Sequence, residues 1–207
     1  MADRITIDPA HFDPGVLDKA IDVLRGGGVV AYPTDTLYGL AADPRSADAV
    51  TRVFALKGRP EASALTLIAA DAEQASGAAF FSARAAALAG AMWPGPLTIV
   101  TAARSGLAPE ALAGGATVGV RVPAHDIARA LARSFGFCIT ATSANRSGEV
   151  PTANPDAVLD ALPAVDLLID AGAAPGGPPS TIVDATSDVL RLIRDGAVPW
   201  SRVLESA

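Results

Sequence analysis

Residues 29–40 read VVAYPTDTLYGL, and this stretch decides how the rest of the chain is interpreted. The apolar run 29–32 has the length of a buried β-strand, and Pro33 ends it because proline has no amide hydrogen to donate to a neighbouring strand. A tight polar turn follows, with two hydroxyls and a carboxylate in residues 34–36. Such a turn can orient a small polar substrate, although polar turns more often satisfy only their own backbone.

Outward from this turn, apolar runs of strand length alternate with segments of helical periodicity. This alternation predicts an α/β fold around a mostly internal sheet. The stretch 171–179 is rich in glycine and proline, and too few residues follow it to build a second core, so residues 1–207 are expected to form a single domain. Further strands are predicted at 4–7, 65–69, 97–101, 117–122, 137–142, 166–170 and 181–184, and helices at about 14–24, 46–57, 82–92 and 126–135 and from 155 onward.

The composition favours a folded protein of the cytoplasm. Half of the 207 residues are hydrophobic and 18% are charged, which is enough apolar material for a core. No apolar run reaches the roughly 18 residues of a membrane-spanning helix, and no signal-peptide pattern opens the chain. Cys138 is the single cysteine, which excludes an internal disulfide, and with two histidines the chain has too few ligands for a zinc site.

The formal net charge of −6 disfavours extensive non-specific binding of nucleic acid. A local basic cavity for a small phosphorylated ligand is still compatible with it. The chain contains no G-x-x-x-x-G-K-[ST] sequence, and its glycine triplet at 26–28 lacks the spacing of a dinucleotide fingerprint. A nucleotide-binding enzyme with this sequence must therefore build its phosphate site in another way.

Polar residues gather at the ends of the predicted strands and helices, where ligands bind in open α/β sheets. Lys57 and Arg59 flank a glycine at what is expected to be an exposed helix end, where periodicity alone favours the simpler role of neutralising the helix dipole. Residues 140–145 (TATSAN) supply hydroxyls, an amide and backbone N–H groups that could hold phosphate or ribose oxygens. A hydroxyl pair, two threonines of the polar turn and two arginines complete the candidate set: Ser180, Thr181, Thr34, Thr36, Arg121 and Arg194.

Taken together, these clusters resemble the YrdC-type L-threonylcarbamoyladenylate synthase family. Each motif is weak alone, but the set occurs in the family's order over nearly the whole chain. The motifs are 32–40 (YPTDTLYGL), 57–60 (KGRP), 93–98 (WPGPLT), 119–123 (GVRVP), 142–145 (TSAN), 180–184 (STIVD) and 194–196 (RDG).

The resemblance implies a twisted mixed sheet with flanking helices around a concave, positively lined cavity. It implies a nucleotidyltransferase that joins L-threonine and bicarbonate into a carbamate, which attacks the α-phosphate of ATP and releases pyrophosphate. Mg²⁺ is the expected ion with ATP, and no protein side chain is assigned to it. The family's tetrad falls on Lys57, Arg59, Ser143 and Asn145, expected to be catalytic and to bind ATP together with Arg194. Threonine is expected to bind Thr34, Thr36, Arg121, Ser180 and Thr181, with the Arg121 fork gripping the carboxylate.

By the same resemblance, the product passes to a tRNA threonylcarbamoyl transferase complex, and tRNA is a further candidate partner. Ala64 stands where the family usually has proline. Little sequence follows Arg194, so the chain is expected to be the short form of the family. Two alternatives remain open. One is an RNA-binding module without catalysis, and the other is a paralogue of the same fold that uses another carbamoyl or acyl substrate.

Overall fold

A computed structural model describes residues 2–58 and 64–206, and within them eleven strands form one mixed sheet. The strands are β1 (Asp3–Thr6), β2 (Val30–Tyr32), β3 (Gly39–Ala41), β4 (Thr66–Ile68), β5 (Ala79–Phe80), β6 (Leu97–Ala103), β7 (Thr117–Arg121), β8 (Ile139–Ser143), β9 (Leu167–Asp170), β10 (Thr181–Asp184) and β11 (Arg191–Arg194). The helices are α1 (Asp18–Arg25), α2 (Ala47–Lys57), α3 (Ala72–Ala78), α4 (Ala83–Met92), α5 (Asp126–Phe135), α6 (Pro155–Ala161) and α7 (Trp200–Glu205), with 3₁₀ turns η1 (Pro14–Leu17) and η2 (Pro109–Leu112).

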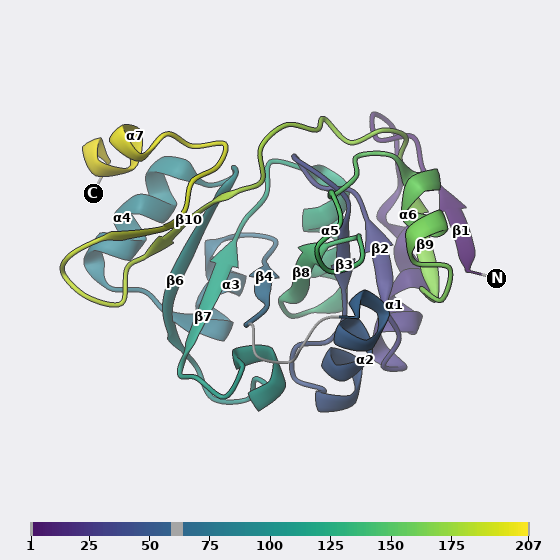
Figure 1. The fold of residues 1–207 in the computed structure, drawn as a ribbon, viewed down its shortest axis with the longest axis horizontal. Coiled ribbons are helices and arrows are strands. Elements are labelled where there is room, and N and C mark those ends of the chain that lie inside the picture. The colour runs from purple at the N-terminus through teal and green to yellow at the C-terminus, as the bar shows by residue number, and fades with distance from the viewer. Residues whose placement is uncertain (1, 59–63, 207) are drawn as a thin grey trace.

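The sheet joins two halves of the molecule. Its strand order is β1-β9-β2-β3-β8-β4-β7-β6-β10-β11, and β5 pairs with β6 at one side. The two termini lie at opposite ends of the molecule, and the chain after β9 crosses from one half to the other before it enters β10 (Figure 1). There β10 pairs in parallel with β6, so the 171–180 segment bridges both halves.

The core lies on both faces of the sheet, because side chains alternate along a strand. In β2, Val30 and Tyr32 pack into the apolar cluster that contains α1 and α5. Ala31, between them, packs on the other face with α2 and α6. Since helices cover both faces, this strand is apolar throughout, as its sequence predicts.

Local sequence signals place several helix ends where they were expected. Ser46 caps α2 by accepting a hydrogen bond from the amide of Ala49 at 3.2 Å, and Gly58 ends it in the left-handed region at φ 59°. The limits of α5 are those predicted. The first helix differs, because Asp13 caps a 3₁₀ turn (η1) that leads into α1.

Five elements were not predicted: β3, α3, β5, β11 and α7. Strand β3 has three residues, too few for a recognisable period, and it forms through antiparallel pairing with β2 and β8. Tertiary pairing thus creates a strand where the sequence indicated only the second half of a turn. Among the helices of the described residues, none has the length and apolar character needed to span a bilayer.

Candidate active site

A cavity of about 280 Å³ lies between the two halves of the sheet. The turn after β2 and strand β8 line it from one half, and β7, β10 and β11 line it from the other. Another cavity, of about 300 Å³, lies among α3, α4 and α5 and is mostly apolar. Of the residues predicted for the site, those that line the 280 Å³ cavity are Thr34, Thr36, Arg121, Ser143, Ser180 and Arg194.

The turn after β2 is held by its own hydroxyl. Thr34 Oγ1 donates to the carbonyl oxygen of Leu37 at 2.7 Å and accepts from the amide of Thr36 at 3.2 Å. The carbonyl oxygen of Thr36 in turn accepts from the amide of Gly176 at 2.8 Å, which ties the bridging segment to the turn. The Thr34 hydroxyl therefore serves its own loop. Thr36, whose Oγ1 lies 3.2 Å from that of Thr34, lines the cavity together with it.

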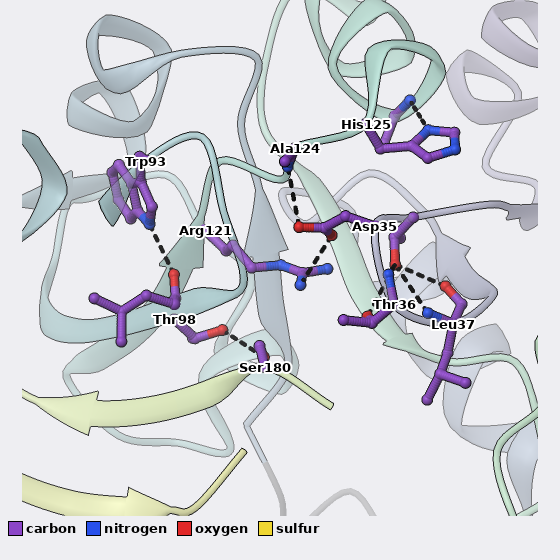
Figure 2. A network of polar contacts seen from close by, with 12 residues as sticks. Asp35, Thr36, Leu37, Trp93, Thr98, Arg121, Ala124, His125 and Ser180 are labelled. Atoms are coloured by element: carbon purple, nitrogen blue, oxygen red, sulfur yellow. Dashed lines mark hydrogen bonds and ion pairs between the residues drawn. The ribbon is translucent and has the colours of Figure 1, made fainter. Parts of the chain in front are cut away.

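Arg121 ends β7 and lines the cavity as a buried cation. Its Nη1 lies 3.2 Å from Oδ1 of Asp35, and the other oxygen of that carboxylate accepts from the amide of Ala124 at 3.0 Å. Figure 2 shows the guanidinium pointing toward the Asp35 carboxylate. A buried guanidinium is costly without an opposite charge, and Asp35 supplies that charge.

Ser180 precedes β10 and is held by two neighbours. Its Oγ lies 2.9 Å from Oγ1 of Thr98, a contact drawn in Figure 2. Arg194 Nη2 donates to the carbonyl oxygen of Ser180 at 2.7 Å and to its Oγ at 3.0 Å. The hydroxyl is thereby fixed in direction at the cavity wall, as a substrate-binding hydroxyl must be.

Two arginines line this cavity in a chain of net charge −6, and one of them, Arg121, is paired with Asp35, while no acidic side chain of the described residues is part of the lining. Partial burial of the Arg194 guanidinium, together with the nearby positive charge of Arg121, lowers the pKa of Arg194. The Arg194 guanidinium nevertheless stays charged at neutral pH, because arginine titrates far above it. The cavity is thus suited to a ligand that carries several negative charges.

Lys57 departs from its prediction. It was expected at an exposed helix end, but 3% of its surface is accessible. Its Nζ donates to the backbone carbonyl oxygens of Ser143 and Asn145, the latter at 2.9 Å. The ammonium therefore holds the segment that leaves β8, and Lys57 is not among the residues that line the cavity.

The remaining predicted residues also differ in placement. Asn145 is buried and is not among the residues that line the cavity; its Nδ2 donates to the carbonyl oxygens of Arg146 and Glu149 at 2.8 and 2.7 Å. The hydroxyl of Thr181 donates to the carbonyl oxygen of Val198 at 2.7 Å, so it faces away from the cavity that Ser180 lines. Arg59 lies outside the described residues.

The sequence predicted Asp35 only as part of a turn that orients a substrate, and it gave no role to Thr98. Both residues stand in the family motifs quoted above, but the contact of Asp35 with Arg121 and that of Thr98 with Ser180 were not predicted. Thr98 gave a usable signal, because it is a hydroxyl in the otherwise apolar start of a strand, and buried hydroxyls need a partner. The pairing of Asp35 with Arg121 could not be predicted from the sequence, because the two residues lie 86 positions apart.

Comparison with known proteins shows the family and the fold of the chain. A family model that is named for Sua5, YciO and YrdC and carries the description "Telomere recombination" matches residues 22–196. The chain belongs to the Sua5/YciO/YrdC family. Its twisted mixed sheet is the fold of the family's solved members.

A threonylcarbamoyl-AMP synthase of Halorhodospira halophila is 52% identical to this family member over 130 residues, which cover 62% of this chain and 68% of that protein. The synthase of Bacillus subtilis is 37% identical over 84% of this chain, but that match covers 49% of the Bacillus protein. The chain thus spans about half to two thirds of the length of these curated relatives.

Two solved structures are similar over the whole fold. The Pyrococcus abyssi Sua5 structure in complex with L-threonine has a TM-score of 0.92 and 32% identity, and the match covers 100% of this chain and 60% of that one. Escherichia coli YciO has a TM-score of 0.88 and 28% identity, with 96% and 98% covered.

Proposed function

We propose that this chain is an L-threonylcarbamoyladenylate synthase, an enzyme of the cytoplasm that uses L-threonine, bicarbonate and ATP. The observation that carries the proposal is the meeting of Thr36, Arg121 and Ser180 with Ser143 and Arg194 in one cavity. The first three are the residues expected to bind an amino acid, and the last two are expected to bind a nucleotide. Relatives with this family's fold are named as synthases of this kind, and one is solved with L-threonine.

The proposed reaction makes and breaks bonds at two centres. The threonine amine attacks the carbon of bicarbonate, water leaves, and an N–C bond forms to give a carbamate. A carbamate oxygen then attacks the α-phosphorus of ATP, and the bond from that phosphorus to the bridging oxygen breaks as pyrophosphate leaves. Negative charge grows on the leaving pyrophosphate, and fixed cations would stabilise it.

The residues of the cavity fit these steps by position. Arg121 offers a guanidinium to the threonine carboxylate, and Thr36 and Ser180 offer hydroxyls to its polar groups. Ser143 and Arg194 line the same cavity and would bind the nucleotide there. Arg59 stays a predicted phosphate ligand. Lys57 and Asn145 would act through the segment they hold and not by contact with ATP. Catalysis would then rest on positioning and charge, without a covalent intermediate.

Mg²⁺ belongs to the proposal as part of the Mg²⁺–ATP substrate. In the described part of the chain, no group of three or more acidic, histidine or cysteine side chains could hold a metal ion. Phosphate oxygens of ATP and water molecules would then be the ligands of this ion. The product would pass to a tRNA threonylcarbamoyl transferase complex, with tRNA as a further candidate partner.

The test is pyrophosphate release from ATP and Mg²⁺ with bicarbonate, with and without L-threonine, beside a reaction with L-serine. We expect release that depends on L-threonine and on bicarbonate, together with an adenylate whose mass is that of threonylcarbamoyl-AMP. A folded protein that binds ATP but releases no pyrophosphate would refute the synthase. Carbamoyl or acyl donors would then be tried for the paralogue, and RNA for the binding module.

A further inference from the structure

Asp35 is fixed at both oxygens of its carboxylate. Oδ2 accepts a hydrogen bond from the amide of Ala124 at 3.0 Å, and Oδ1 lies 3.2 Å from Nη1 of Arg121. The two side chains are 9% and 7% exposed, so water screens this ion pair weakly. Asp35 does not line the cavity, whereas Arg121 does. The carboxylate therefore contacts the guanidinium without forming part of the cavity lining.

The ion pair balances charge without a well-aligned hydrogen bond. Arg121 Nη1 and Asp35 Oδ1 are both buried atoms that have no hydrogen-bond partner in the structure. A guanidinium has five N–H donors in a planar fork, so one such contact leaves donors for a ligand. Asp35 thus stabilises the buried positive charge and still allows Arg121 to grip a second carboxylate.

The same contacts join two walls of the cavity. Asp35 lies between Thr34 and Thr36 in the turn after β2, and Ala124 follows Arg121 closely in the loop after β7. The carboxylate connects that turn to that loop through one backbone amide and one cation. It is placed to set both the direction of Arg121 and its distance from the hydroxyl of Thr36.

We propose that Asp35 is a positioning residue for the amino-acid substrate. It holds the guanidinium of Arg121 where the substrate's α-carboxylate binds, and it does not contact the substrate itself. This inference rests on the proposed function, since it takes Arg121 as the carboxylate ligand. It adds to the proposed function that Asp35 affects substrate binding by holding Arg121 in place.

The test is calorimetric titration of L-threonine into the full chain and into the variants Asp35→Asn, Arg121→Gln and the double variant. Asp35→Asn keeps the shape of the side chain and removes its charge. We expect it to weaken L-threonine binding roughly 10-fold, because residues joined in one salt bridge are coupled by energies that correspond to a change of this order. In the Arg121→Gln background the same change should add little, because the two residues act as one unit.

A ligand without the carboxylate separates positioning from a general structural role. L-threoninamide should bind the parent chain and Asp35→Asn equally weakly, and ATP affinity should stay the same in both. If Asp35→Asn does not fold, Asp35→Glu takes its place, because it keeps the charge and displaces it by one methylene. Thermal unfolding of each variant confirms that the folded protein is titrated.

Several results would overturn the inference. They are unchanged or tighter L-threonine binding by Asp35→Asn, an equal further loss in the Arg121→Gln background, and a parallel loss for L-threoninamide and ATP. If the parent chain itself binds no L-threonine, the proposed function fails and the inference falls with it. Normal binding by the parent and by Asp35→Asn would refute the inference alone.

Discussion

The Nζ of Lys57 donates a hydrogen bond to the backbone carbonyl oxygen of Asn145 at 2.9 Å, across 88 residues of sequence. A second bond from the same ammonium reaches the carbonyl oxygen of Ser143, the last residue of β8. Helix α2 thereby fixes the segment that brings Ser143 to the cavity. A lysine that appears in sequence as a free surface cation is a buried support of the site.

Replacing Lys57 with methionine should therefore reduce stability as well as turnover. Methionine keeps much of the side chain's length but leaves at least two carbonyl oxygens without their donor. We expect the free energy of unfolding to fall by about 1–3 kcal/mol and ATP affinity to fall with it. Urea titration and ATP binding measure the two effects. Lys19→Met, at an exposed ion pair with Asp3, should leave the free energy of unfolding nearly unchanged. Full stability of Lys57→Met would contradict the supporting role.

Thr98→Val should raise the KM for L-threonine. The hydroxyl of Thr98 is fully buried and lies 2.9 Å from that of Ser180, so its loss frees the Ser180 hydroxyl to turn. The value of one neutral hydrogen bond predicts a rise of roughly 2- to 12-fold. Thr101→Val is the matched control, because Thr101 lies on the same strand and donates to the carbonyl oxygen of Phe80. An equal KM for both variants would show that Thr98 does not orient Ser180.

Gly196→Ala should displace the segment that carries Arg194. A Cβ at Gly196 would lie 2.3 Å from the carbonyl oxygen of Pro179 and 2.7 Å from the amide nitrogen of Thr181. Because these are backbone atoms, a change of side-chain rotamer cannot relieve the clash. Overpacking of this kind costs about 1–3 kcal/mol. We expect that loss in urea unfolding, with weaker ATP binding. At Gly90, in α4, a Cβ meets nothing within 4 Å, so Gly90→Ala should be neutral or stabilising. Equal stability of the two variants would argue against the close contact.

Stability should decline above about pH 9, because burial raises the pKa of Cys138 from 9.0 to about 12 and that of Tyr38 from 10.0 to about 12. The folded chain then keeps protons that the unfolded chain releases. Stability is thus complete below the unfolded pKa values and is lost as pH rises toward the folded ones. Each group contributes a slope of about 1.4 kcal/mol per pH unit.

Urea unfolding at pH 8, 9 and 10 measures this slope. Cys138→Ala removes the group that titrates first in the unfolded chain, so its stability should change less between pH 9 and pH 10 than that of the parent. Identical slopes for the two proteins would mean that the Cys138 thiol does not titrate as described.

The sequence predicted those elements whose signals are local. Helix α5 has a strong apolar period and ends at Gly136, which adopts a φ of 85°, so neighbouring residues alone define it. Strand β3 and strand β11 have no such signal. Strand β11 is exposed along its length and forms by pairing with β10, a partner that the sequence does not reveal.

The sequence by itself determined the family, the alternation of strands and helices, and the residue types that surround the cavity, because motifs and periods are properties of neighbouring residues. Tertiary structure decided which of these residues line the cavity and which are buried away from it. It buried Lys57 against two carbonyl oxygens, turned Thr181 toward Val198, and paired Asp35 with Arg121. These outcomes depend on contacts between segments far apart in the chain, where burial makes each charge and hydroxyl take the partner that the fold brings near.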